Sequence, residues 1–203
     1  GGATEDITFY TKEGTLIDNK DDILQQKLLA FEYGAKLKID HAYSTFGGGA
    51  ANAAVCLAYL GFKVAAMIAI GEDNRGKSIL ENFQKKKVST ALVQKIKNVE
   101  SGFSLLLAGP SNEHIVFSNR AANKYLSIGD KEKKELAQGE WLYMTSLSGK
   151  WREVLAQVFS VRGPKIAWNP GHIQLHTGVK VIGKYLKKVE MLVVNKDEAT
   201  ELV

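Results

Sequence analysis

From residue 63 onward, the chain alternates between short apolar segments and helical patterns, and this alternation restricts the fold more than any other feature. A continuous apolar run from Lys63 to Ile70 is followed by a helical pattern from Arg75 to Lys87. Further apolar segments, each followed by a helical pattern, lie at 141–145, 165–168 and 191–194. Strands joined through a helix run parallel, because the helix returns the chain across the sheet before the next strand begins. We therefore predict an α/β fold whose mainly parallel sheet is covered by helices on both faces.

Two segments depart from this alternation and predict a small separate sheet. Residues 28–39 alternate polar and apolar side chains, which is typical of a strand with one exposed face, and Gly34 marks a bulge or turn. Two further strands, 103–108 and 114–118, are joined by the sequence GPSNE, whose Gly, Pro and Asn favour a hairpin turn. We expect the strands of this second sheet at about 27–40 and 103–118.

A run of three glycines, Gly47 to Gly49, stands immediately before a helical pattern from Ala50 to Leu60, which is apolar almost all round and predicts a buried helix. Glycines allow a ligand to approach the backbone closely, and the first N–H groups of a helix are free to bind oxygen atoms. Asn52 interrupts the apolar helix start, where a buried amide is stable only when its donor and acceptor are both used. We favour a ligand contact for Asn52, and the alternative is a structural cap that holds the loop.

The glycine run does not fit two common nucleotide-binding patterns. A dinucleotide fingerprint needs glycine at position 52, and a Walker phosphate loop needs Gly-Lys-Ser or Gly-Lys-Thr after the glycines. Position 52 is asparagine, and neither tripeptide follows the glycines. The loop is therefore predicted to bind a polar ligand in another way.

Composition narrows the surroundings in which such a protein works. The longest uncharged apolar run is far below the about 20 residues that a membrane-spanning helix needs, so we expect no membrane span and no export signal. Cys56 is the only cysteine and lies in an apolar helical pattern, which predicts a buried thiol, no intrachain disulfide and a reducing cytoplasm. The net charge of +5 comes with lysine clusters on several predicted helices, so solvated helix faces are favoured over a nucleic-acid surface.

Several motifs follow the order that they have in one known family. Residues 47–79 resemble the first signature of the ribokinase family of carbohydrate and nucleoside kinases, including its helix, the next strand and a Gly-Glu-Asp-Asn-x-x-Gly turn. Residues 1–6 resemble the first strand of the family, and residues 119–126 resemble its R-G-A-N-x-x-L segment. Asn-Pro at 169–170 and N-x-x-E at 195–198 match two later elements. The resemblance covers nearly the whole chain and implies a ribokinase-like three-layer sandwich, with a mainly parallel central sheet and a small β lid.

The resemblance also implies ATP-dependent phosphorylation of a hydroxymethyl group on a sugar or nucleoside. The implied cofactors are ATP and Mg²⁺, with a monovalent cation as a further one. No direct metal ligand is expected, because Mg²⁺ usually keeps several waters. The implied substrate-binding residues are Asp6, Gly47, Gly48, Asn52 and Arg120, and the implied ATP and magnesium residues are Asn195 and Glu198. A salt bridge at the end of its strand is an equal alternative for Arg120, and helix capping is an alternative for the N-x-x-E pair.

The resemblance is incomplete in one decisive place. The second family signature, Asp-Thr-x-Gly-Ala-Gly-Asp, supplies the catalytic base, and no such string occurs here. We therefore expect residues 1–203 to be a kinase domain without its C-terminal catalytic segment, with no catalytic residue and no activity on its own. Ala50 replaces the Lys or Gly of the first signature, and Thr4 stands where some sugar-specific members have Asn. The substrate therefore stays open among ribose, fructose, ketodeoxygluconate and nucleosides.

Two other functions compete with the kinase interpretation. A non-catalytic sugar-binding relative would keep the pocket without the chemistry, and a doubly wound oxidoreductase domain would bind a dinucleotide. The expected partner is a small-molecule sugar or nucleoside, with neither nucleic acid nor membrane. A homodimer through the lid is suggested by the alternating Leu29, Phe31 and Tyr33, although packing of the lid against substrate explains the same pattern.

Overall fold

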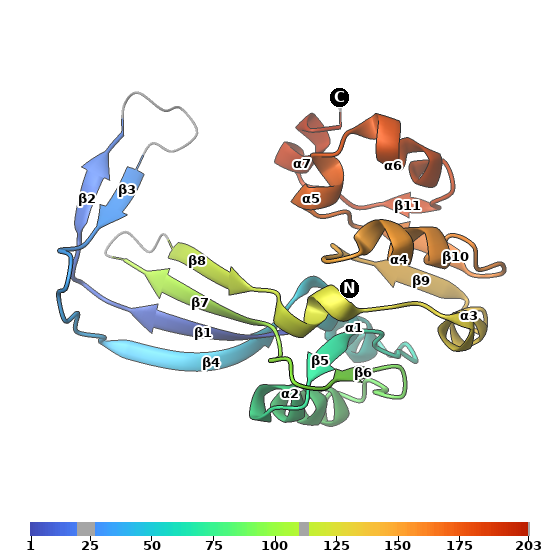
Figure 1. The fold of residues 1–203 in the computed structure, drawn as a ribbon, viewed down its shortest axis with the longest axis horizontal. Helices are drawn as coiled ribbons and strands as arrows, with labels where there is room; N and C mark the ends of the chain where they lie inside the picture. Colours follow the sequence, from blue (N-terminus) through green and yellow to red (C-terminus); the bar gives the residue numbers. More distant parts are fainter. Residues whose placement is uncertain (20–26, 110–113, 203) are drawn as a thin grey trace. The chain divides into compact units, whose positions relative to one another are not determined.

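The computed structural model describes residues 1–19, 27–109 and 114–202, and the chain divides into two compact units (Figure 1). We call them the core unit, which contains Gly1–Glu5, Phe46–Gly102 and Arg120–Val203, and the strand unit, which contains Asp6–Thr45 and Phe103–Asn119. Each unit is therefore assembled from segments that are distant in the sequence.

Parallel strands form the sheets of the core unit, as the alternation of strands and helices predicts. Strand β10 (Lys165–Trp168) lies between β9 (Trp141–Met144) and β11 (Met191–Leu192), and it is parallel to both. Strand β5 (Ala69–Gly71) pairs in parallel with β6 (Gln94–Ile96). The predicted strand 63–70 is correct only in part, because an isolated bridge at Ala65 and the short β5 replace one continuous strand.

Helices separate these strands, and the helices at 74–85 and 151–158 each bury one face. Two apolar clusters result: Val154, Leu155 and Val158 meet Trp168 in one, and Ile79 and Phe83 meet Ile68 and Ile70 in the other. The helical elements are α1 (Gly49–Tyr59), α2 (Asn74–Lys85), the 3₁₀ helix η1 (Ala121–Tyr125), α3 (Asp130–Leu136), α4 (Trp151–Val158), α5 (His172–Leu175), α6 (Val179–Leu186) and α7 (Lys196–Thr200).

Helix α1 corrects two predictions made from its apolar sequence. Only Ala51 and Ala54 are buried in it, so the helix is not surrounded by other layers. Cys56 is exposed, which contradicts the predicted buried thiol. Small apolar residues such as alanine occupy both faces of this helix. Because an alanine side chain has little apolar surface, the order of residues in the sequence does not indicate which face is covered.

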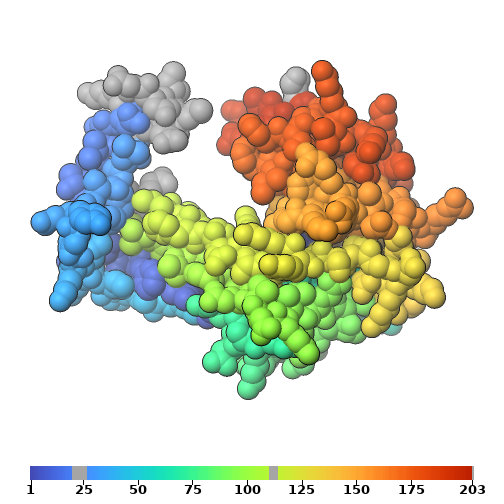
Figure 2. Space-filling model, viewed as in Figure 1, coloured from blue at the N-terminus to red at the C-terminus, as the bar shows by residue number. Residues whose placement is uncertain are grey.

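The strand unit is built on a sheet in the order β4-β1-β7-β8, with a separate two-stranded sheet of β2 and β3. The predicted hairpin of β7 and β8 is confirmed, with Phe103 opposite Asn119 and Ala108 opposite His114. Part of its turn, 110–113, lies outside the described residues. All six residues of β8 are exposed, and this strand lies open on the face shown in Figure 2. The strands are β1 (Thr4–Tyr10), β2 (Thr15–Asp18), β3 (Lys27–Ala30), β4 (His41–Gly47), β7 (Phe103–Ala108) and β8 (His114–Asn119).

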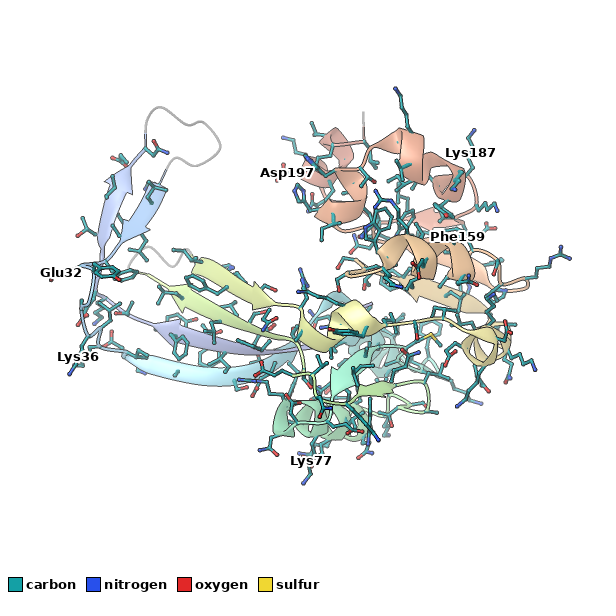
Figure 3. The ribbon with its side chains drawn as sticks, in the orientation of Figure 1. Glu32, Lys36, Lys77, Phe159, Lys187 and Asp197 are labelled. Atoms are coloured by element: carbon teal, nitrogen blue, oxygen red, sulfur yellow. The ribbon has the colours of Figure 1, made fainter. Side chains whose placement is uncertain are left out.

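The predicted strand 28–39 is largely wrong. Only its start belongs to a strand, β3, and the chain from residue 31 to 40 forms none. Glu32 and Lys36, which Figure 3 labels, lie in this irregular segment. Leu29 and Phe31 are half-buried, because both pack on Gly14, where an added Cβ would lie 2.9 and 2.7 Å from their side-chain atoms. Their alternation therefore reflects packing within the strand unit, and of the three alternating residues only Tyr33 is fully exposed.

Candidate functional site

The start of helix α1 presents backbone donors that the fold leaves available. The carbonyl of Gly2 accepts hydrogen bonds from the N–H groups of Ala50 (3.1 Å) and Ala51 (3.4 Å). The N–H groups of Gly48 and Gly49 have no acceptor among the residues that the structure describes. Two free donors at the positive end of an 11-residue helix favour an electronegative group, such as a hydroxyl or phosphate oxygen.

Glycine is required at position 48 for two physical reasons. Its φ is +92°, in the left-handed region that other residues rarely adopt. A Cβ at this position would also lie 2.6 Å from the carbonyl oxygen of Gly2. The predicted glycine loop is therefore a close crossing of two backbone segments as well as a ligand candidate.

Asn52 lies on the exposed face of α1, one turn after the glycines. Its exposure contradicts the argument from a buried amide, while its prediction as a ligand contact stays a prediction. The side chain borders a cavity of about 300 Å³ that is lined by residues of α1, of α2 and of the end of β4. Gly49 and Asn52 are three residues apart on α1 and both are exposed, so these two positions are neighbours on one face of the helix.

Thr145 lies beside the glycine loop and was not identified from the sequence. It follows β9, is 2% exposed, and its hydroxyl oxygen has no hydrogen-bond partner among the described residues. A Cβ on Gly49 would stand 3.0 Å from the Cβ of Thr145. Its buried position was not predictable, because the sequence does not show which strand end meets the start of α1.

Asn123 is the other residue that sequence reasoning missed. Its side-chain amide is 4% exposed and pairs with both backbone groups of Ala3: Oδ1 accepts from the Ala3 N–H at 3.1 Å, and Nδ2 donates to the Ala3 carbonyl at 2.9 Å. The available signal is the R-A-A-N segment at 120–123, but a linear motif does not state which backbone groups its asparagine contacts.

The remaining two predicted substrate residues lie in different units. Arg120 belongs to the core unit and is exposed, and within the described residues it forms no ion pair, so the salt-bridge alternative is not supported. Its carbonyl accepts a hydrogen bond from the N–H of Asn123 at 2.9 Å. Asp6 belongs to the strand unit, is half-buried, and its backbone carbonyl accepts from the hydroxyl of Thr45 at 3.4 Å.

Asn195 and Glu198 form a reciprocal cap at the start of α7. The Glu198 N–H donates to Asn195 Oδ1 at 2.8 Å, and the Asn195 N–H donates to Glu198 Oε2 at 3.0 Å. The structure thus confirms the capping geometry for the N-x-x-E pair. Asn195 is exposed and Glu198 is half-buried, and both follow β11, at the carboxyl edge of a parallel sheet, where α/β folds commonly place ligands. Asn169 follows β10 at the same edge, and its amide donates to the Val193 carbonyl at 2.7 Å.

A polar network fixes the turn before α2. Asp73 caps this helix by accepting from the Gly76 N–H at 2.8 Å, and it also accepts from the Ser101 N–H at 2.9 Å and the Ser101 hydroxyl at 2.6 Å. Burial alone would raise the pKa of Asp73, but these hydrogen bonds outweigh it and lower the pKa below its usual value. In the next turn, Arg75 forms an ion pair with Glu5 at 3.1 Å.

No group of three or more His, Cys, Asp or Glu side chains is placed to hold a metal ion in ranges 1–19, 27–109 and 114–202. In the same part of the chain, every helix is too short or too polar to cross a membrane.

Comparison with known proteins places this geometry in a family. A ribokinase of Haemophilus influenzae is 29% identical over 159 residues, which are 76% of this chain and 50% of that protein. A ribokinase of Mus musculus is 28% identical over 88 residues, which are 43% of this chain and 27% of that protein. The chain thus spans about half the length of the Haemophilus influenzae relative and a smaller share of the Mus musculus relative.

Solved structures show the same fold. The structure of Arabidopsis thaliana ribokinase complexed with ribose and ATP matches with a TM-score of 0.80 at 18% identity, over 100% of this chain and 60% of that one. The Burkholderia thailandensis nucleoside kinase in complex with inosine matches with a TM-score of 0.73 at 15% identity, over 100% of this chain and 61% of that one. These matches confirm the predicted ribokinase-like α/β fold. The family model described as pfkB family carbohydrate kinase matches residues 17–203, and the chain therefore belongs to that family.

Proposed function

We propose that this chain supplies the substrate pocket of a kinase that uses ATP to phosphorylate a hydroxymethyl group of a sugar or nucleoside. The observation that carries the proposal is the start of α1, where the free N–H groups of Gly48 and Gly49 lie about one helical turn before Asn52, whose side chain is exposed. Such a set of donors and acceptors suits the hydroxyl groups of a sugar. The family match favours a kinase over a non-catalytic sugar-binding relative.

The proposed substrate residues bind and orient rather than react. Gly47 and Gly48 allow the sugar to approach the backbone, and Asn52 offers one donor and one acceptor from its amide. Asp6 would accept hydrogen bonds from substrate hydroxyl groups, and Arg120 would face the substrate or a phosphate group. Positioning of this kind is the main contribution that a protein makes to phosphoryl transfer.

The residues at the start of α7 fit a nucleotide with its magnesium ion. Asn195, which is exposed, and Glu198, which is half-buried, carry oxygen-bearing side chains at the carboxyl edge of the β9–β11 sheet, and Mg²⁺ prefers oxygen ligands and retained waters. One Glu198 oxygen holds the Asn195 N–H, and the carboxylate can still order water through its other oxygen. When bound, ATP supplies the phosphoryl group. We propose that a monovalent cation assists as a further cofactor.

The strand unit is proposed to act as a lid that excludes water from the bound substrate. Its exposed apolar side chains, which include Ile115, Val116 and Phe117 of β8, would suit a homodimer formed through the lid. The single cysteine is compatible with a reducing cytoplasm as the site of action, and the scattered lysines favour a small-molecule partner over nucleic acid.

The pocket is tested by nuclear magnetic resonance on residues 1–203, because shifts of individual amides report even millimolar binding. Ribose, fructose, adenosine and inosine are titrated while the Gly48 and Gly49 amides are followed. We expect one of these ligands to shift both signals, and Asn52→Ala to weaken its binding about tenfold through the loss of a hydrogen bond. Lys77→Ala, on the exposed side of α2 (Figure 3), is the control and should bind as the parent chain does.

The catalytic part of the proposal has a separate test. The chain alone is expected to form no ADP from ATP with any of these ligands, because it lacks the second family signature. The complete gene product should form ADP with the ligand that shifts Gly48 and Gly49. Absence of shifts in the chain together with absence of turnover in the complete product would overturn the proposed function.

A further inference from the structure

The side-chain amide of Asn123 pairs with the backbone of Ala3 as a residue of a neighbouring strand would. A residue in a sheet offers one N–H and one carbonyl to its neighbour, and the Asn123 amide provides the matching acceptor and donor at 3.1 and 2.9 Å. Both residues are buried, at 4% and 0% exposure, so water cannot replace the lost bonds. An apolar side chain at position 123 would leave two buried backbone groups of Ala3 unpaired.

Ala3 is joined directly to the backbone group that holds the glycine loop. The neighbouring Gly2 carbonyl accepts from Ala50 and Ala51 at the start of α1, and the Gly48 backbone crosses it so closely that a Cβ would lie 2.6 Å away. A displacement of Ala3 would therefore move the Gly2 carbonyl, and with it the position of the free donors on Gly48 and Gly49.

The Asn123 amide is itself held in place from its other side. A Cβ on Gly102 would lie 2.3 Å from Asn123 Nδ2, so this glycine is packed against the amide. The Gly102 carbonyl accepts from the Glu5 N–H at 3.1 Å, and the adjacent Ala122 N–H donates to the Glu100 carbonyl at 2.9 Å. The orientation of the amide is set by Ala3, because only Oδ1 can accept from the Ala3 N–H and only Nδ2 can donate to the Ala3 carbonyl.

We propose that Asn123 is a positioning residue for the substrate site. It fixes Ala3, Ala3 fixes the Gly2 carbonyl, and that carbonyl orients the start of α1 toward a substrate hydroxyl. The part of this inference that concerns substrate rests on the proposed function, whereas the part that concerns the helix start does not.

A matched control is present in the same chain. Gln94 makes the same pair of bonds to Ser127, with Nε2 donating to its carbonyl at 2.7 Å and Oε1 accepting from its N–H at 3.1 Å. Neither residue bonds to Gly2 or to α1. Gln94→Ala therefore removes the same kind of hydrogen-bond pair, at an exposed position, without touching the glycine loop.

The experiment measures amide hydrogen exchange of Ala50 and Ala51, and ligand-induced shifts of Gly48 and Gly49, in residues 1–203. Asn123→Ala should speed exchange at Ala50 and Ala51 by about tenfold relative to Phe83 in α2, because local opening is set by local contacts. It should also weaken ligand binding by a similar factor. Gln94→Ala should change both quantities by less than about twofold.

Should Asn123→Ala fail to fold, Asn123→Ser keeps a small polar hydroxyl beside Ala3 without adding a buried charge, and it is expected to raise exchange at Ala50 and Ala51 selectively but less strongly. Exchange that rises equally in α1 and α2, or that stays at the parental rate in α1, would overturn the positioning role. A parent chain that binds no ligand, with selective exchange in Asn123→Ala, would count against the proposed function and leave the clamp supported.

Discussion

Removal of the Asp73 carboxylate should destabilise the core unit by about 3 kcal/mol, judged from the bonds that it makes. Loss of a helix N-cap costs about 0.5–2 kcal/mol, and each buried donor left unpaired costs about 1–3 kcal/mol. Asp73→Ala removes the cap on Gly76 and the acceptor for two donors of Ser101, which is fully buried. The expected cost lies near the lower end of the summed range of these costs, because Asp73 itself is half-exposed and water can replace part of its contribution.

Urea unfolding at pH 7, followed by circular dichroism, measures this loss. Asp73→Asn keeps one oxygen acceptor and should cost less than Asp73→Ala. Because the folded pKa of Asp73 lies below its unfolded value of 3.8, the stabilisation is present above pH 4 and disappears as the pH falls through the folded pKa. The parent chain should therefore lose more stability than Asp73→Asn when the pH falls from 5 to 3.

Two results would refute this reasoning. One is a cost below about 0.5 kcal/mol for Asp73→Ala, which is the range of ordinary surface substitutions. The other is simple additivity of Asp73→Ala with Ser101→Ala, because residues that share hydrogen bonds should show a coupling free energy.

Three further predictions concern single residues. Ala121 has a φ of +36°, and Ala121→Gly should raise the free energy of unfolding by about 0.5–1 kcal/mol in urea, because glycine relieves left-handed strain; a lower midpoint would contradict this. Gly48→Ala should lower the free energy of unfolding by at least about 1 kcal/mol more than Gly61→Ala does, because both glycines have φ near +90° but only a Cβ at position 48 would meet a backbone oxygen. Equal losses would contradict a role for the close backbone crossing at Gly48. Cys56 should react with a thiol reagent in the native chain within minutes, and reaction only after unfolding would contradict its exposure.

Much of the core unit could be predicted from periodicity. Strand β10 was predicted with its observed bounds, and α2 within two residues at each end, because buried strands and amphipathic helices carry strong local patterns. Strand β4 was missed, since residues 41–45 are exposed and show no apolar period. Its strand conformation depends on pairing within the β4-β1-β7-β8 sheet, which is a long-range property.

The site was predictable where one segment contains the whole signal. The glycines and Asn52 lie within six residues, and their proximity follows from the helix that they begin. Asn123 and Ala3 are separated by 120 positions, and no local pattern states that one pairs with the other. Thr145 likewise reaches the loop only because β9 ends beside the start of α1.

The sequence by itself determined the α/β class, the hairpin, the helix starts and the family, because backbone conformation and binary patterning depend on neighbours within a few residues. Tertiary structure decided which face of α1 is covered, that Cys56 is exposed, and that Asn123 holds the strand beside the glycine loop. These outcomes depend on which surfaces meet in three dimensions. Burial and buried hydrogen bonds depend on contacts between segments that are distant in the sequence, and the local pattern of side chains does not specify those contacts.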